Sequence, residues 1–139
     1  MVLLFSFSGY AQTPAPVLPA SHFAVFSARP ITGLAFLRYP DAPAQALVFY
    51  PTARSPDYEF PGDRPLKFVE LNTGRVVAEA IIPPEFRRAL LLFAPLDPGA
   101  AGGDLRFQIS VLDDTTIRHA PGALAVINLS GLSLAGTAN

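Results

Sequence analysis

The sequence is divided into short apolar runs, and this division is the feature that most limits what the chain can fold into. Proline, glycine, asparagine and aspartate interrupt the runs before any of them reaches the length of a typical helix. No window carries apolar residues at the 3.6-residue spacing of an amphipathic helix over such a length. Short runs bounded by turn-forming residues are typical of β-strands. The sequence therefore predicts an all-β chain.

Eight runs have the composition of strands, and turn signals separate them. They are residues 23–27, 32–39, 46–50, 66–71, 75–82, 89–94, 105–112 and 123–130, with a weaker ninth run at residues 132–135. Strands at this spacing favour a sandwich or a barrel. The 139 residues leave room for one such domain, and a charged fraction of only 15% excludes disorder from excess charge. We expect an antiparallel β-sandwich, immunoglobulin-like in architecture, with a partly open β-barrel as the alternative.

Three stretches predict the strands in more detail. Along residues 105–111, apolar side chains alternate with polar ones, which predicts a strand with one buried and one solvated face. Residues 88–94 read RALLLFA, which favours a central strand that is covered on both faces. The turn Asn72-Thr73-Gly74 joins the runs on either side of it as a three-residue hairpin loop, because glycine supplies the positive φ that closes such a loop.

Residues 39–65 differ from the rest of the chain because they contain six prolines. A sheet interior does not tolerate so many prolines, so we expect one edge strand at residues 46–50, open to strand addition, and then an extended connection. The aromatic residues of this segment are Tyr39, Phe49, Tyr50, Tyr58 and Phe60. On a stiff loop, exposed aromatic side chains lose little entropy on binding, so these five are predicted to contact a carbohydrate, a peptide or a neighbouring subunit. In the alternative interpretation, the last four fold back and close the open end of the sandwich.

Catalytic and cofactor chemistry has few candidate residues. Asp113, Asp114 and His119 could hold a divalent metal ion, but the aspartates equally suit a turn in which they cap backbone N–H groups. No G-x-S-x-G elbow is present, and the absence of cysteine excludes thiol catalysis and thiolate metal sites. The pair Arg87-Arg88 could hold an acidic partner, or it could be a solvated rim. We expect no cofactor, and a net charge of −1 argues against nucleic-acid binding.

The N-terminus predicts export. Residues 2–11 form an apolar run that ends in small residues, with Gly9 and Ala11 at the spacing that a signal peptidase requires. The run is too short to span a membrane. No lysine or arginine precedes it, so an N-terminal strand that docks on the core is the alternative. We expect residues 1–17 to be a signal peptide and short linker, and residues 18–139 to be one β-sandwich domain that is periplasmic or extracellular.

Two stretches resemble a group of uncharacterised exported proteins of environmental bacteria. The first is residues 65–93, PLKFVELNTGRVVAEAIIPPEFRRALLLF, and the second is residues 111–131, VLDDTTIRHAPGALAVINLSG. In that group an LDD turn leads to a PG pair and then to a strand that ends in NLS. The resemblance implies export and a β-fold, and it carries no activity and no functional residue.

Together these observations predict a non-catalytic exported or cell-envelope module. It would bind a protein or glycan partner or assemble with copies of itself. The alternative is a small metal-dependent hydrolase that uses Asp113, Asp114 and His119.

Overall fold

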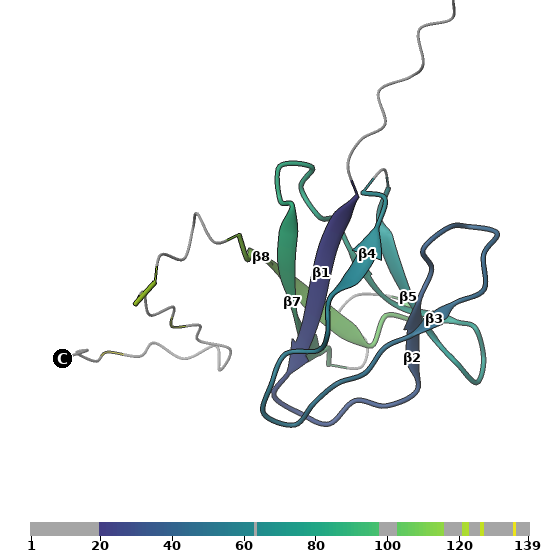
Figure 1. The fold of residues 1–139 in the computed structure, drawn as a ribbon. Coiled ribbons are helices and arrows are strands. Elements are labelled where there is room, and N and C mark those ends of the chain that lie inside the picture. Colours follow the sequence, from purple (N-terminus) through teal and green to yellow (C-terminus); the bar gives the residue numbers. More distant parts are fainter. Residues whose placement is uncertain are drawn as a thin grey trace, which may run out of the picture.

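A computed structural model describes residues 20–62, 64–97 and 103–115, together with positions 121, 122, 126 and 135. These residues form a two-layer β-sandwich of eight strands without a helix, which confirms the predicted fold class (Figure 1). One sheet has the strand order β4-β1-β7-β8 and the other has the order β3-β2-β5-β6. The strands are β1 (Ser21–Ser27), β2 (Leu34–Phe36), β3 (Gln45–Ala46), β4 (Tyr58–Phe60), β5 (Leu66–Glu70), β6 (Val76–Ala80), β7 (Arg88–Pro95) and β8 (Phe107–Asp113). The described residues contain no helix long and apolar enough to cross a membrane.

The pairing of β1 with β7 is the one exception to the expected antiparallel arrangement among the described strand pairs. The two strands run parallel, in a register that extends from His22 opposite Arg88 to Ser27 opposite Phe93. The other five pairs are antiparallel. Parallel neighbours cannot be joined by a tight turn. The chain between β1 and β7 therefore makes a long excursion, during which it builds the whole of the second sheet and β4.

Phenylalanine side chains fill the space between the two sheets. Phe23 of β1 meets Phe36 of β2 edge to face, with ring centroids 5.1 Å apart, and Phe68 of β5 at 6.3 Å. Phe68 in turn meets Phe93 of β7 at 5.0 Å. All four rings are almost completely buried. Edge-to-face contact between rings adds to the free energy gained by burying their area, so this cluster holds the sheets together.

The structure confirms the detailed predictions for two strands, β7 and β8, although Leu105, predicted on the buried face, precedes β8 and is 36% exposed. β7 is internal, and its residues Leu91 and Leu92 are both buried although they point to opposite faces of the sheet. Along β8, Phe107, Ile109 and Val111 pack against the core. The intervening Gln108 and Ser110 are exposed.

The turn between β5 and β6 has the predicted geometry. Gly74 has a φ of 69°, and its N–H donates to the carbonyl of Glu70 at 2.8 Å. The N–H of Glu70 donates to the carbonyl of Arg75 at 3.0 Å, which closes the loop.

Two hydrogen bonds connect the sheets along their sides. On one side, the N–H of Val48, just beyond β3, donates to the hydroxyl of Tyr58 in β4 at 3.0 Å. On the other side, the N–H of Arg106, just before β8, donates to the carbonyl of Val77 in β6 at 2.7 Å. Each bond satisfies a backbone group at the margin of the second sheet.

The proline-rich segment departs from the prediction in two places. The edge strand expected at residues 46–50 is reduced to Gln45–Ala46, because the N–H of Val48 bonds a side chain in place of a strand partner. In addition, Tyr58–Phe60 forms β4 where an extended connection was expected. The predicted strands at residues 123–130 and 132–135 and the predicted signal peptide and linker at residues 1–17 lie outside the continuous described ranges.

We predict that Gly74→Ala destabilises the domain by about 1 kcal/mol, because a side chain disfavours the left-handed backbone conformation. An added Cβ at Gly74 would meet no atom within 4 Å, so the cost is purely conformational. Gly103→Ala is the matched control, since its Cβ also meets nothing and its φ lies outside that region. Urea unfolding of both variants checks this, and equal losses of stability would contradict it.

Candidate functional site

Three of the five aromatic residues predicted to bind a partner are instead used to anchor the proline-rich segment. Tyr58 and Phe60 are buried in the core. The ring of Phe49 packs edge to face on Phe93, with centroids 5.1 Å apart. These three side chains close the open end of the sandwich, as the alternative interpretation expects. The apolar interior offers them more contact than solvent does. Tyr58 and Phe60 are therefore not accessible to a partner, and Phe49 is partly buried.

The remaining two aromatic residues stay exposed on this anchored segment. Tyr39 is 46% exposed and Tyr50 is 44% exposed. Val48, two residues before Tyr50, is 46% exposed. Side chains alternate along residues 47–50, because Leu47 and Phe49 face the core while Val48 and Tyr50 face outward. The inward side chains thus hold the outward ones in place.

Two guanidinium groups flank the ring of Tyr39. Arg38 lies 5.6 Å and Arg64 lies 5.7 Å from the ring centroid, within the range of cation–π attraction. Arg64 also donates a hydrogen bond to the backbone carbonyl of Arg38 and lies 5.6 Å from the ring centroid of Phe60. Arg38 forms an ion pair with Glu59 at 3.0 Å. Tyr39 is therefore held in position although nearly half of its surface faces solvent.

A hollow of about 320 Å³ is formed by residues on both sides of Tyr39 in the sequence, by the start of β5 and the residues before it, and by the first residue of β6. Its lining residues are Leu37, Pro40, Arg64, Pro65, Lys67 and Val76. Four of these are apolar, and the two charged residues are both cations. Tyr39, its flanking Arg38 and Arg64, and this hollow together form the Tyr39 surface.

Two of the three predicted metal ligands, Asp113 and Asp114, have other partners in the structure. The carboxylate of Asp113 accepts hydrogen bonds from the backbone N–H of Thr115 at 3.1 Å and from its hydroxyl at 2.9 Å, as the alternative turn interpretation expects. Asp114 is bonded to Arg54. His119 lies outside the described residues, within which no group of three or more His, Cys, Asp or Glu side chains could hold a metal ion.

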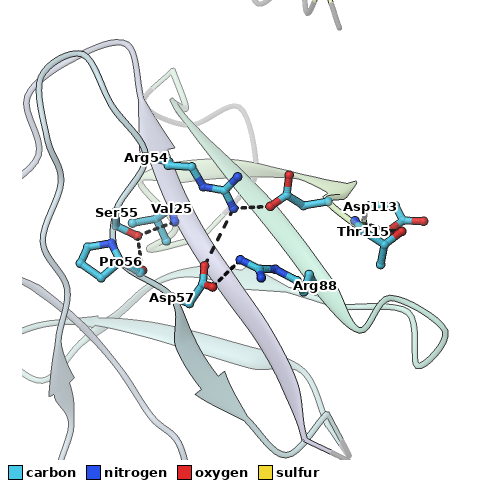
Figure 2. Close-up of polar contacts among 9 residues, drawn as sticks. Val25, Arg54, Ser55, Pro56, Asp57, Arg88, Asp113 and Thr115 are labelled. Atoms are coloured by element: carbon cyan, nitrogen blue, oxygen red, sulfur yellow. Dashed lines mark hydrogen bonds and ion pairs between the residues drawn. The ribbon is translucent and has the colours of Figure 1, made fainter. Parts of the chain in front are cut away.

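Asp114 instead ends a chain of alternating charges that crosses the outer face of the β4-β1-β7-β8 sheet. The side chain of Arg54 lies across β1 (Figure 2). It pairs with Asp114, which directly follows β8. Arg54 also lies 3.9 Å from Asp57, which pairs with Arg88 of β7. The two acids and two bases neutralise each other, so this chain of ion pairs has a structural role. Arg88 of the Arg87-Arg88 pair is one of its members.

Ser55 fixes the position from which Arg54 reaches across the sheet (Figure 2). The N–H of Ser55 donates to the carbonyl of Val25 at 2.9 Å, and the N–H of Val25 donates to the Ser55 hydroxyl at 2.8 Å. That hydroxyl donates in turn to the carbonyl of Pro56 at 2.8 Å. Ser55 is buried, so it extends the pairing along β1 beyond β4 and keeps its neighbour Arg54 above the strand.

Asp114 raises the pKa of Arg54 above its ordinary value, mainly through their hydrogen bond and against the opposing effect of burial. A raised pKa means that the charged form is favoured by folding. The stabilisation is therefore fully present below the ordinary pKa of arginine and is lost only as the pH rises through the raised pKa. Titration of Arg54 contributes no pH dependence of stability near neutrality.

A second surface feature was not anticipated from the sequence. Two hollows of about 540 and 570 Å³ share the residues Glu70, Pro95, Arg106 and Phe107. Arg106 and Glu70 form an ion pair at this shared boundary. The lining comes from the loop after β1, the β5–β6 hairpin and the approach to β8, each of which has only a turn signal in the sequence. The opposite charges at this boundary therefore neutralise each other.

Comparison with known proteins yields no match to a family model, a curated protein or a solved structure. The resemblance of residues 65–93 and 111–131 to exported bacterial proteins therefore stays a prediction.

We predict that Arg54→Met lowers the free energy of unfolding by about 0.5–1 kcal/mol at low ionic strength, because its ion pairs are partly exposed. Salt screens such pairs, so the loss should shrink in 1 M sodium chloride. Urea unfolding at both salt concentrations measures this. Arg87→Met is the control. Arg87 is exposed and precedes Arg88 in the sequence, and its replacement should alter stability at neither salt concentration.

Proposed function

We propose that this chain is a non-catalytic, exported β-sandwich module that binds a protein partner at the Tyr39 surface. One observation carries the proposal: Tyr39 is exposed, yet two guanidinium groups and an adjacent hollow hold and frame it. A side chain that is already positioned loses little conformational entropy when a partner covers it. Tyrosine and arginine are also the residue types that contribute most to protein interfaces.

The chemistry of the Tyr39 surface supports a protein partner over a glycan. A mainly apolar hollow of about 320 Å³ is large enough for one apolar side chain of a partner. Arg64 and Lys67 at its lining would favour acidic residues next to that side chain. Sugar rings, by contrast, need several polar groups to bond their hydroxyls. We therefore expect a partner segment in which acidic residues flank an apolar one.

The export part of the proposal rests on residues 2–11. Their apolar run, and the small residues that end it, have the form of a signal peptide core and its cleavage site. The domain contains no cysteine, so folding in an oxidising compartment would require no disulfide. The resemblance to exported bacterial proteins agrees with this location.

Cross-linking and affinity capture of the tagged protein from its native envelope tests the binding site. We expect Tyr39→Ser to reduce capture of the partner about tenfold or more, since an interface tyrosine of this kind is a typical hot spot. Lys67→Glu should also weaken capture, because it reverses a charge at the hollow.

Leu71→Ser is the matched control for this experiment. Leu71 is 52% exposed but lies in the β5–β6 turn, away from the lining of the Tyr39 hollow. The Leu71→Ser variant should retain full capture of the partner. Equal capture by all variants would refute the Tyr39 surface as the binding site. Release of the partner by free oligosaccharide would mean that the surface binds a glycan and not a protein.

Export makes a separate prediction about the mature N-terminus. If signal peptidase cleaves after Ala11, the secreted chain begins at Gln12. Intact mass measurement of protein recovered from the envelope or medium checks this. An unprocessed chain found only inside the cell would contradict export and leave the binding proposal to be tested separately.

A further inference from the structure

The two adjoining hollows beside the β5–β6 turn differ in how their charges are paired. In the hollow of about 570 Å³, Arg75 pairs with Asp104 at 2.8 Å. Its other cation, Arg106, pairs with Glu70. The hollow of about 540 Å³ contains this second pair and also Arg29. Within residues 20–62, 64–97 and 103–115, the guanidinium of Arg29 has no ion pair or hydrogen bond. This Arg29 hollow therefore carries one uncompensated positive charge.

The segments that form the Arg29 hollow are bonded to one another. The N–H of Leu71, in the β5–β6 turn, donates to the carbonyl of Gly33, in the loop after β1, at 2.9 Å. The carboxylate of Glu70 pairs with Arg106, just before β8. The same carboxylate accepts a hydrogen bond from the hydroxyl of Thr73 at 3.0 Å. These contacts fix the walls relative to each other, so a ligand would meet a site that is already formed.

The backbone that carries the free guanidinium is also held in place. The N–H of Arg29 donates to the hydroxyl of Ser27 at 3.2 Å, and Ser27 is buried at the end of β1. Pro30 follows, and its ring fixes the backbone φ there. The side chain of Arg29 therefore starts from a defined point at the hollow, which lowers the cost of ordering it on a ligand.

The rest of the lining combines an apolar wall with two polar side chains. Ile31 and Phe107 pack against the core but are only partly buried, and both line the hollow next to the exposed Pro95. An apolar ligand body would remove this surface from water. Thr32 and Asn72 also line the hollow, and their side chains have no hydrogen-bond partner among the described residues. They can bond further polar groups of a ligand.

We propose that the Arg29 hollow binds an organic carboxylate, with its carboxylate on the guanidinium of Arg29 and its apolar body against Ile31 and Phe107. The planar guanidinium matches a carboxylate, because it can donate two parallel N–H···O bonds. One free cation compensates one negative charge. A phosphate group, with nearly two negative charges, would exceed that and would also be repelled by Glu70.

Two sources can supply this chemistry, namely the C-terminal carboxylate of a peptide and a small free acid. The Arg29 hollow has no lining residue in common with the hollow of the Tyr39 surface. Binding at the two surfaces can therefore be tested separately, and the proposal does not depend on the proposed function.

NMR titration of the isotope-labelled full chain with phenylpropionate tests the site. We expect the backbone amide signals of Gly33 and Thr73, which line the hollow, to shift as the acid is added. Phenylpropanamide has the same body without the charge, and it should bind about fivefold more weakly. An acetylated tripeptide that ends in phenylalanine identifies the source. Tighter binding of this peptide than of phenylpropionate would support a peptide C-terminus, and weaker binding would support a small acid.

Substitution of Arg29 tests the role of its charge. Arg29 is exposed, so changes there should leave the core intact. Arg29→Gln should weaken binding of phenylpropionate about fivefold, to the level of the amide. Arg29→Glu should reverse the preference, so that phenylpropylamine binds in place of the acid. Arg87→Gln, at an exposed arginine outside the lining, is the matched control and should bind phenylpropionate as the wild type does.

Three outcomes would overturn the proposal. The first is equal binding of phenylpropionate and phenylpropanamide by the wild type, because the charge would then play no part. The second is an unchanged affinity for phenylpropionate in the Arg29→Gln variant, because the acid would then bind elsewhere. The third is that neither the acid nor the peptide shifts the signals of Gly33 and Thr73 up to the limit of solubility.

Discussion

The contact of Phe23 with Phe36 and Phe68 is the interaction on which the rest of the structure depends. It joins the two sheets, and Phe93 extends it to the strand beside β1. Rings packed edge to face leave little space for rearrangement, so the separation and the relative position of the sheets are well defined. Tyr58 joins the same cluster through Phe23 and Phe36. Through its hydroxyl, the core thus also positions the outer segment at Val48.

The fold was predictable from the sequence wherever local patterning decides structure. Alternation in β8, the continuous apolar run of β7 and the Asn72-Thr73-Gly74 turn each depend on neighbouring residues alone. β4 was missed because its three residues lie between prolines that normally exclude a strand, and its pairing with the distant β1 and the burial of Tyr58 and Phe60 override them. The parallel pairing of β1 with β7 has no local signal at all.

The candidate surfaces were harder to predict because they combine distant parts of the chain. The sequence indicated Tyr39 as a candidate binding residue. The guanidinium of Arg64, which lies beside the Tyr39 ring, comes from the other end of the proline-rich segment. Asp114 suggested a metal ligand until the structure paired it with Arg54, sixty residues away in sequence. Composition also could not separate exposed aromatic residues from buried ones. Whether a tyrosine faces the core depends on the strand register around it, as Tyr50 and Tyr58 illustrate.

The parallel pairing of β1 with β7 determines the order in which the chain can fold. β1 is the first of the described strands, yet its longest partner comes roughly sixty residues later. During synthesis, β1 must therefore wait several seconds before β7 emerges, with Phe23 and Val25 still without their final neighbours. The β5–β6 hairpin, whose contacts are local, can form earlier. An extended apolar strand that waits for its partner is prone to aggregation, so a chaperone that holds β1 would speed the recovery of folded protein.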